Sequence, residues 1–434
     1  METLNSILSR YTPDQDEQLK LKEIADSIIN SIRAYCKINS IQASPVLVGS
    51  VAKGTNLRGA DIDIFIVFER IYSENEMERI GLEIGRSVLP GGEEKYAEHP
   101  YISGVMGGIK LDIVPCFRIE PNKRIISSVD RTPLHTEYVA RNLSDQGRNE
   151  VRLLKLFMKH FGIYGSEIKT GGFSGYVCEL LVIKFGSFKN VIANIAGLKR
   201  FRLEINDHEM KYDPRFPVVI QDPTDYSRNA AAAVSAESFA KLILASKIFV
   251  ESGNVEMFIP KPPISPEPIR PNGNFFRIVE IPRPDLVDDI VFSQAVRFKK
   301  EVRKALEDGG FLPVNEEVAV GSSIEVLVEF QREKTSGVRK HQGPPVWAEN
   351  ALEFLHKWSN SEKAYRRPYV EGDRLFVDIM ETAVSADEAI MSHISRANIG
   401  RNLNPLKPKV SISDPVKTGR KYLVLGKYYS ESIG

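Results

Sequence analysis

Three aspartates in the first third of the chain have the spacing of a metal-binding site. Asp61 and Asp63 stand two residues apart in a segment with apolar alternate positions, which predicts a strand with both carboxylates on one face. Asp112 lies in a second alternating segment and also faces away from its apolar side. If the two strands are neighbours, three carboxylates converge. Hard oxygen ligands of this kind suit Mg²⁺, which can activate a hydroxyl and neutralise a triphosphate.

Small residues just before the acids add a second signal. Gly49 and Ser50 follow a short apolar segment, 45–48, and Lys53 adds a positive charge nearby. A loop of such residues lets backbone and hydroxyl groups approach phosphate oxygens. An isolated Asp-x-Asp is more often the solvated face of a half-buried strand. A phosphate-binding loop followed by metal carboxylates is a more specific pattern than either part alone.

The segments that must position these residues can be read from periodicity and capping. Thr12-Pro13-Asp14-Gln15 predicts a helix start, with Thr12 as the cap, and Ser73 with Glu76 predicts a capping box. Met106-Gly107-Gly108 reads as the turn of a hairpin. The predicted strands are 45–48, 61–68, 101–105 and 109–114, and the predicted helices span about 12–35, 73–89, 151–161, 174–186 and 236–252.

A proline-dense stretch, 260–271, predicts a domain boundary because it cannot continue a helix or a central strand. Beyond it, strand-like 275–281, a helix at about 288–308 and strand-like 324–330 suggest a small α+β unit with a β-α-β-β start. We therefore predict an α+β protein with three domains. They are a catalytic domain at 1–145, a helical central domain completing the nucleotide pocket at 146–257, and a C-terminal α+β body and tail at 258–434.

Bulk composition limits the class of protein without revealing its partner. The 434 residues are 42% hydrophobic and 26% charged, typical of a globular protein of about three domains. No stretch approaches the length of a membrane span, and the N-terminus lacks the pattern of a signal peptide. Cys36, Cys116 and Cys178 fit no disulfide or metal spacing, which favours a reducing cytoplasm. With a net charge of +1, any nucleic acid must bind local basic patches.

Longer motifs around the acids carry a family resemblance. Gly49-Ser50 with Lys53 and Thr55, then Asp61-Ile62-Asp63 and Asp112, resembles the DNA polymerase beta-like nucleotidyltransferase superfamily. Further matches, dense over about 45–235, resemble the archaeal-type (class I) CCA-adding enzymes. These are Tyr96-Ala97-Glu98-His99-Pro100-Tyr101, Leu111-Asp112-Ile113-Val114-Pro115-Cys116, Val129-Asp130-Arg131-Thr132-Pro133 with His135, Asn149-Glu150-Val151-Arg152-Leu153-Leu154-Lys155, Gly162-Ile163-Tyr164-Gly165, Gly172-Phe173-Ser174-Gly175-Tyr176, Asp222-Pro223 and Arg228-Asn229.

The resemblance implies a fold and an activity. The fold would be a nucleotidyltransferase palm, a mixed sheet with flanking helices, followed by a helical domain and a C-terminal RNA-binding region. The activity would be template-independent addition and repair of the 3′-terminal CCA of tRNA from CTP and ATP. Two Mg²⁺ ions would assist in-line transfer, and pyrophosphate would leave. A cytoplasmic homodimer that binds the tRNA acceptor stem and 3′ end, and no membrane, is expected.

The resemblance also implies roles for individual residues. The three acids, Asp61, Asp63 and Asp112, would be catalytic and hold magnesium; relatives can have Glu at the first position, and the connecting loop here is slightly short. Arg228 would help to read the base. The remaining expected nucleotide ligands contact chiefly the triphosphate, and they are Ser50, Lys53, His135, Lys155 and Tyr164.

Each of these roles has a plainer alternative. Lys155 shares a helical stripe with Arg148, Arg152 and Lys159, and such stripes are usually solvated. His135 and Tyr164 could be structural, and Arg228 an ordinary exposed arginine. His99 is not assigned to the site, because a His-Pro turn with apolar flanks can be structural.

RNA-binding patches and rival functions complete the hypotheses. The basic candidates are Arg297, Lys300 and Lys304 on one helix; a loop with Arg332, Lys334, Arg339, Lys340 and His341; and Arg401, Lys407, Lys409, Lys417, Arg420, Lys421 and Lys427 near the end. Each could equally be a solvated basic surface. The rival functions are a poly(A) polymerase or small-molecule adenylyltransferase of the same fold, and a noncatalytic RNA-binding module.

Overall fold

The chain forms two compact units, Met1–Pro262 and Pro263–Ser432. The computed structural model describes residues 3–96, 99–120, 127–206, 208, 212–335, 337–380 and 384–430. Ala97 and Glu98 of the predicted Tyr96–Tyr101 motif lie outside these ranges. The mixture of helices and sheets confirms the predicted α+β class. In the described ranges no helix is both long and apolar enough to cross a membrane.

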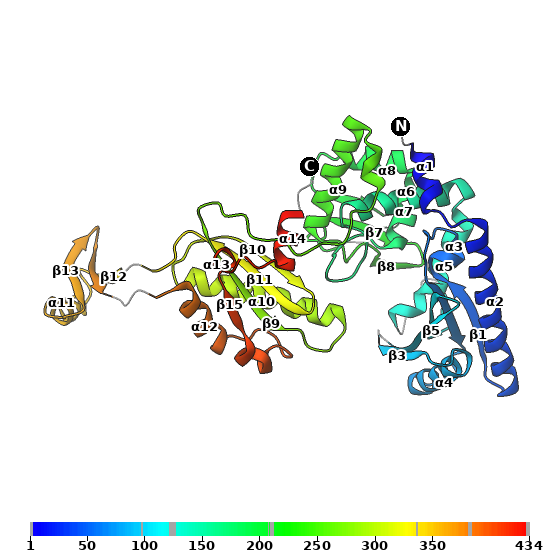
Figure 1. Cartoon of the computed structure of the whole chain (residues 1–434), viewed down its shortest axis with the longest axis horizontal. Helices are drawn as coiled ribbons and strands as arrows, with labels where there is room; N and C mark the ends of the chain where they lie inside the picture. The colour runs from blue at the N-terminus through cyan, green and yellow to red at the C-terminus, as the bar shows by residue number, and fades with distance from the viewer. Residues whose placement is uncertain are drawn as a thin grey trace. The chain divides into compact units, whose positions relative to one another are not determined.

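A five-stranded sheet organises the first part of unit 1 (Figure 1). Its elements, in chain order, are α1 Leu4–Tyr11, α2 Gln15–Ile38, β1 Ala43–Val48, α3 Gly49–Lys53, β2 Ile62–Phe68, α4 Glu74–Val88, β3 Glu93–Tyr96, β4 Pro100–Met106, β5 Ile109–Phe117, the 3-10 turn η1 Ser128–Arg131 and α5 Thr132–Asn142. The strand order is β1-β2-β5-β4-β3, with β2 and β5 parallel and the other pairs antiparallel. The strands around the predicted acids are therefore direct neighbours.

The two faces of this sheet differ in what they contact. One face packs under α2 and α4 in a single apolar cluster, to which β2 contributes Ile62, Ile64, Ile66 and Phe68 as predicted. The other face carries Phe65 and Val67, which pack with Cys116 beside η1. Because side chains alternate along a strand, Asp63 lies on this second face. Burial of the isoleucines thus fixes where the aspartate points.

Local signals set most element ends, with two differences from prediction. Ser73 and Glu76 form the expected capping box of α4, and Gly107 and Gly108 form the turn between β4 and β5 with positive φ. The N-cap of α2 is Asp14 rather than Thr12, and its carboxylate accepts from the backbone of Glu17. The predicted phosphate loop after β1 is a five-residue helix, α3, because the backbone turns immediately at Gly49.

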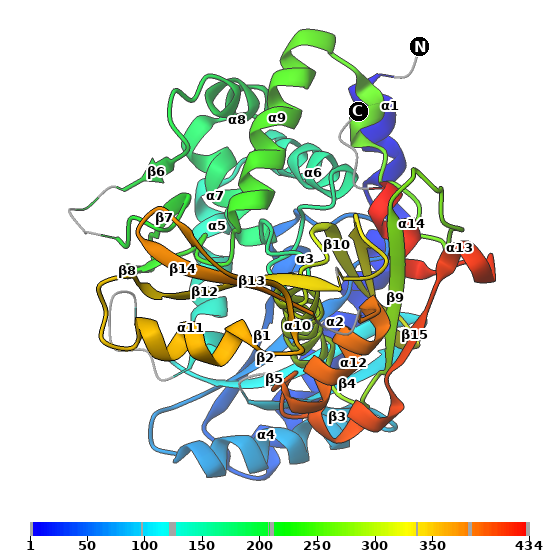
Figure 2. The ribbon, with the colours of Figure 1, turned by 90° about the vertical axis from the view of Figure 1, so that its left-hand side faces the viewer.

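Helices dominate the rest of unit 1. Its elements are α6 Asp145–His160, α7 Gly175–Phe185, α8 Phe188–Ala196, β6 Leu203–Ile205, β7 Val218–Asp222, β8 Asp225–Asn229, α9 Ala236–Ser252 and η2 Val255–Phe258. Helices α6 to α9 lie together in both views (Figures 1 and 2). Their apolar cluster also includes Ile7 of α1 and Val139 of α5. The helical region predicted for 146–257 is confirmed as secondary structure, while its separation at 145 stays a prediction.

Unit 2 begins with the predicted β-α-β-β order. Its elements are β9 Phe275–Pro282, α10 Asp288–Asp308, β10 Pro313–Val320, β11 Ser323–Phe330, β12 Val338–Pro345, α11 Ala351–Ser359, β13 Ala364–Glu371, β14 Arg374–Met380, α12 Ala386–Arg396, η3 Asn404–Lys409, β15 Ser411–Ser413, α13 Pro415–Thr418 and α14 Leu423–Ser430. One sheet has the order β10-β11-β9-β15, and a smaller one has the order β12-β14-β13. The second sheet was not predicted from the sequence: its outer strands β12 and β13 are largely polar, although its middle strand β14 is apolar at most positions.

Both faces of the larger sheet are covered. Helices α10 and α12 pack on one face, in a cluster with Val279 and Val326. Tyr422, Val424 and Leu425 at the end of the unit pack on the other face against Phe276 and Leu327. The backbone of Tyr422 also pairs with Glu267 in the proline-rich stretch, at N–O distances of 2.9 and 3.1 Å. The beginning and the end of unit 2 are therefore joined.

Candidate active site

The three predicted carboxylates lie at one end of the β2–β5 pair. Asp63 and Asp112 are direct partners in the parallel register, and Asp61 immediately precedes β2. The Ser103 hydroxyl donates to Asp112 Oδ1 at 2.6 Å and holds that carboxylate in place. Two neighbouring strands thus present three acids at one sheet end, as the alternation pattern predicted.

Close approach at Gly49 brings α3 against Asp63. Gly49 has φ +74°, and a Cβ at this position would lie 2.3 Å from Asp63 Oδ2. Any side chain here would therefore both strain the backbone and displace the carboxylate. Gly49 thus makes room for the acid, and its approach to phosphate oxygens stays a prediction.

Burial and the neighbouring carboxylates both oppose ionisation within the acid cluster. Burial, with the carboxylates of Asp112 and Asp61, raises the pKa of Asp63 to about 6. Lys110 Nζ lies between the other two acids, 3.0 Å from Asp61 Oδ2 and 3.1 Å from Asp112 Oδ2. Partial burial alone would lower the pKa of Lys110, but its bonds to Asp61 and Asp112 raise that pKa. The cluster thus already attracts a cation, and the alternation that places Lys110 on the face of Asp112 was visible in the sequence.

The acid cluster fits a hard divalent ion by its chemistry. Carboxylate oxygens are the ligands that magnesium prefers, and an ammonium group now stands between two of them. A tighter group of potential ligands occurs elsewhere among the described residues. Glu74, Glu78 and His99 have ligand atoms within 4.8 Å of one another, and His99 Nδ1 is 2.8 Å from Glu78 Oε1. The described side chains thus include carboxylate groups suited to divalent metal.

A buried group of lysines lies on the helical side of the site. Lys53, at the end of α3, is 2.6 Å from Glu179 Oε2 on α7. Lys155 on α6 donates to the Thr55 carbonyl at 2.9 Å and lies 3.9 Å from Glu179 Oε1. Lys53, Lys155 and Glu179 are 7%, 2% and 0% exposed. Ser50 is half-buried one turn before Lys53.

The basic stripe on α6 is not a solvated face. Arg152 and Lys155 are buried, whereas Lys159 is exposed. Arg152 donates to the carbonyls of Gly54 and Asn56, at 2.7 and 2.9 Å. Burial lowers the pKa of Lys155, and the nearby Glu179 carboxylate opposes that effect. The stripe therefore packs against the segment after α3. Lys155 lies beside Thr55 and near Glu179, the partner of Lys53.

A second buried carboxylate contacts both Arg228, predicted to read the base, and His135, predicted to contact chiefly the triphosphate. Asp222 Oδ2 is 2.9 Å from His135 Nε2 and 2.8 Å from Arg228 Nη1. Tyr176 donates to Asp222 Oδ1 at 3.1 Å and stacks on His135, with ring centroids 3.9 Å apart. Burial alone would raise the pKa of Asp222, but bonds from His135 and Thr224 hold it well below its usual range. Burial lowers the pKa of His135, which favours its neutral form.

Tyr164 lies at the edge of the lysine group. It forms a short bridge with Phe173, and Lys159 Nζ lies 5.1 Å from its ring centroid. A Cβ on Gly175 would lie 3.1 Å from the Tyr164 hydroxyl and 3.6 Å from Lys155 Nζ. Tyr164 and Lys155 therefore share one neighbourhood, although their sequence motifs are separate.

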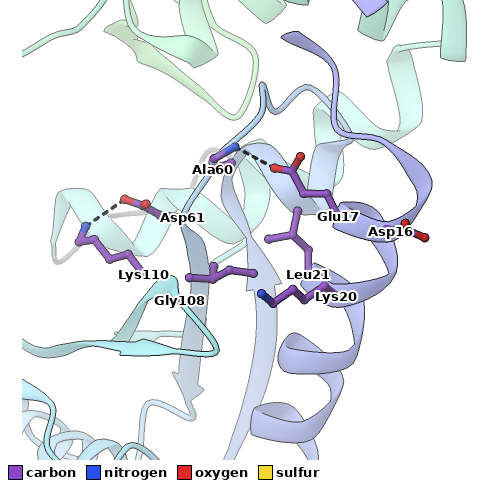
Figure 3. Close-up of a pocket in the computed structure, with 10 residues that line it drawn as sticks. Asp16, Glu17, Lys20, Leu21, Ala60, Asp61, Gly108 and Lys110 are labelled. Atoms are coloured by element: carbon purple, nitrogen blue, oxygen red, sulfur yellow. Dashed lines mark hydrogen bonds and ion pairs between the residues drawn. The ribbon is translucent and has the colours of Figure 1, made fainter. Parts of the chain in front are cut away.

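A pocket adjoins the acid cluster on the side of α2 (Figure 3). Asp61 and Lys110 form one wall, and Glu17 and Lys20 form another. Glu17 Oε1 accepts from the backbone of Gly59 at 2.8 Å, which ties α2 to the segment before Asp61. Figure 3 shows the Asp61–Lys110 ion pair at the margin of this pocket.

The predicted basic patches in unit 2 differ in how far they are neutralised. Arg297, Lys300 and Lys304 of α10 are exposed. Arg339, Lys340 and His341 belong to β12 rather than a loop. In the last segment, Arg420 pairs with Glu280 and Lys427 with Glu317. Basic clustering in sequence therefore overstates the positive charge of that segment, because its counterions come from β9 and β10.

Sequence reasoning missed three residues that organise the site. Glu179 contacts the lysines, Asp222 contacts His135 and Arg228, and Thr55 donates to Glu179 Oε1 at 2.6 Å. A signal for Glu179 was present, since it is a lone acid in the apolar helix α7. Asp222 and Thr55 had been noted only as parts of motifs.

Comparisons with known proteins define the class of this site. Residues 29–135 match a family model described as a nucleotidyltransferase domain. The following ranges, 149–259 and 272–410, match the second domain of tRNA nucleotidyltransferase and the C-terminal domain of CCA-adding enzyme. The chain therefore has a nucleotidyltransferase fold in its first domain, as predicted.

Curated relatives narrow the class to one family. CCA-adding enzymes from Picrophilus torridus and Thermoplasma volcanium are 45% and 42% identical to the chain, covering 98% of it and 98% and 97% of their own lengths. A further CCA-adding enzyme, from Thermoplasma acidophilum, is 42% identical over 98% of each chain. The chain belongs to the family of archaeal CCA-adding enzymes, which confirms the prediction from its motifs.

Proposed function

We propose that the chain adds and repairs the 3′-terminal CCA of tRNA, using CTP and ATP without a nucleic-acid template. Full-length similarity to CCA-adding enzymes supports the substrate and the product. The observation that carries the chemistry is the paired register of Asp63 and Asp112 beside Asp61. Positive charge for the triphosphate is available nearby, because Lys53 at the end of α3 and Lys155 on α6 are buried beside Glu179.

The reaction is an in-line transfer of a nucleotidyl group. The tRNA 3′ oxygen attacks the α-phosphorus of CTP or ATP, a phosphodiester bond forms, and pyrophosphate leaves. Asp61, Asp63 and Asp112 would hold two magnesium ions, which when bound lower the pKa of the attacking hydroxyl and neutralise triphosphate charge. The three aspartates orient the reacting groups, and the hydroxyl proton passes to solvent.

The triphosphate and the base contact different groups in this proposal. Ser50, Lys53 and Lys155 bind phosphate oxygens, and Tyr164 borders them. Arg228, oriented by Asp222, reads the base edge, with His135 stacked nearby on Tyr176. Charged and planar donors of this kind suit phosphates and base edges respectively.

The cellular location, the tRNA-binding region and the oligomeric state are proposed from separate observations. Cys36, Cys116 and Cys178 are unpaired and buried, which favours a reducing cytoplasm. The tRNA is proposed to lie on residues after 258, with Arg297, Lys300 and Lys304 as exposed phosphate contacts. A homodimer is proposed from the family resemblance, and sedimentation equilibrium would measure it.

A single incubation tests the activity. Purified protein, tRNA lacking CCA and labelled CTP and ATP should give addition of C, C and A, followed by a stop. Replacing Asp63 or Asp112 by Ala should reduce incorporation at least about a thousandfold, because the charge that holds the metal is lost. Circular dichroism should show a folded variant.

Two outcomes would contradict the proposal. A long run of A from ATP alone would identify a poly(A) polymerase. Undiminished incorporation by a folded Asp63→Ala or Asp112→Ala variant would refute the metal assignment.

A further inference from the structure

Glu179 is a buried carboxylate that links three elements of the site. It lies on α7 and is 0% exposed. Its Oε2 accepts from Lys53 at 2.6 Å and its Oε1 from Thr55 at 2.6 Å. Thr55 Oγ1 in turn accepts from Lys155 Nζ of α6 at 3.2 Å. A buried carboxylate is unfavourable unless it is paired, and these contacts satisfy both of its oxygens.

The cations around Glu179 carry more charge than it neutralises. Lys53 is directly paired with it, whereas Lys155 is bonded at closer range to the neutral oxygens of Thr55. Arg152, the next buried cation, is bonded to the backbone carbonyls of Gly54 and Asn56. Burial lowers the pKa of both Lys155 and Arg152, so their charged forms favour an additional anion. A polyphosphate has the charge and size to supply it.

We infer that Glu179 is a positioning residue for the triphosphate of both substrates: it holds Lys53 directly, and Lys155 through Thr55, where phosphate oxygens bind. The inference deepens the proposed function and rests on its assignment of these lysines. It assigns Glu179 no contact with the base. Arg228, which is proposed to read the base, is held by a different carboxylate, Asp222, so changes at Glu179 should affect CTP and ATP equally.

Replacement of Glu179 by Gln would disturb this arrangement with little change of shape. The amide keeps one acceptor oxygen, but its NH₂ group would face either the Lys53 ammonium or the Thr55 hydroxyl. A donor facing an ammonium group cannot hold it. Lys53 or Lys155 would then lose its fixed position, while Asp61, Asp63 and Asp112 would stay in place.

The test uses the full-length protein and tRNA substrates that accept C or A. Glu179→Gln should raise the KM for CTP and for ATP by the same factor, on the order of tenfold, because one charge-assisted contact is lost. The kcat should stay within about threefold, because the metal-binding acids are unchanged. Inorganic tripolyphosphate, at fixed free magnesium, should inhibit the variant less strongly by that same factor.

Glu329→Gln is the matched control. Glu329 is also a buried carboxylate, 1% exposed, but it lies in unit 2 and accepts from Asn272, Asn274, Asn315 and Tyr428. Its replacement should leave the KM for both nucleotides and the inhibition by tripolyphosphate unchanged. A general effect of removing a buried carboxylate would instead appear in both variants.

The possible outcomes separate this inference from the proposed function. A folded Glu179→Gln variant with unchanged KM, or with a change for one nucleotide alone, would overturn the inference. If that variant does not fold, Thr55→Val, which removes the hydroxyl between Glu179 and Lys155, should raise both KM values equally, and an unchanged KM would overturn it. Failure of the wild-type protein to add C or A would instead refute the proposed function.

Discussion

Asp63 is the residue at which burial and like charge oppose ionisation most directly. It lies on the partly buried face of β2, opposite Asp112, and its pKa is raised to about 6. In the unfolded chain the same carboxyl has the ordinary value of 3.8. The folded, metal-free protein therefore holds a proton over a range of pH in which the unfolded protein has released it.

Stability of the metal-free protein should fall as pH rises toward 7. Since the folded pKa of Asp63 is the higher one, its contribution is present below pH 4 and is lost as pH rises through about 6. A shift of about two pH units corresponds to about 3 kcal/mol. Asp63→Asn should remove this contribution, so its free energy of unfolding should exceed that of wild type at pH 7 and approach it near pH 4.

Urea unfolding in the presence of a chelator measures this difference. Magnesium should reduce it, because a bound cation favours the ionised carboxylate of the wild-type protein. If the stability of wild type and of Asp63→Asn changed with pH in parallel, the pKa of Asp63 would be the same in the folded and the unfolded protein. The prediction would then be wrong.

For individual residues, the sequence predicted which side chains belong to the site but not which distant residues they contact. Asp61, Asp63 and Asp112 were found because alternation fixes the face on which a side chain lies. Lys155 could not be separated from its basic stripe, because the sequence does not reveal that α6 is covered by the segment after α3. The roles of Glu179 and Asp222 were not predicted for the same reason, because each of them contacts residues that are distant in the chain.

Among the elements, α3 lies between the acid cluster and the buried lysines and contacts both. Its first residue, Gly49, has a positive φ and leaves no room for a Cβ beside Asp63. Its last residue, Lys53, reaches Glu179 on α7. A five-residue helix thus connects the acid cluster to the lysines, and the position of its first turn fixes both.

Gly49→Ala should therefore damage both stability and activity. The positive φ should destabilise the protein by about 1–2 kcal/mol. Displacement of Asp63 should also lower kcat by at least about tenfold, because misplacement of a metal ligand weakens transition-state stabilisation. Thermal unfolding and single-nucleotide addition measure the two effects.

Gly91→Ala is a suitable control, since Gly91 also has a positive φ but has nothing within 4 Å of its Cβ position. It should lose similar stability and keep full kcat. Equal loss of kcat in both variants would mean that backbone strain, rather than contact with Asp63, is responsible.

Element ends were predictable where a cap or a turn sets them locally. Ser73 with Glu76, and Gly107 with Gly108, are examples. The cap of α2 moved from Thr12 to Asp14 because either side chain can accept at a helix start, and tertiary contacts decide between them. The strands β12 and β13 were not predicted because polar strands lack the apolar alternation on which prediction depends, whereas the alternation in β14 was available and was overlooked.

For the whole molecule, each unit has its own apolar clusters. Those of unit 1 draw on residues from Ile7 to Phe258. Those of unit 2 draw on residues from Phe276 to Leu425. All the proposed catalytic and nucleotide-binding residues belong to unit 1. The division between the two units falls within the proline-rich stretch, while the predicted domain boundaries at 145 and 257 stay predictions.

A fragment of residues 1–262 should fold and bind nucleotide but act poorly on tRNA. Tripolyphosphate should bind it with the affinity of the full chain, because Lys53, Lys155 and Glu179 are retained. The KM for tRNA should rise at least about a hundredfold if the region after 258 supplies the phosphate contacts. Calorimetry and steady-state kinetics measure the two properties, and an unchanged KM for tRNA would exclude unit 2 as the tRNA-binding region.

The pairing of Tyr422 with Glu267 has a consequence for biosynthesis. The residues that complete the core of unit 1 are synthesised before β9, so this unit can fold while later parts of the chain are still being made. Unit 2 must wait for its last helix, α14, on the order of ten seconds later. During that interval Phe276 and Leu327 lie on a sheet face without its cover. Until α14 is made, the nascent chain therefore exposes apolar residues on this sheet face, at a time when all the residues of the unit 1 core have already been made.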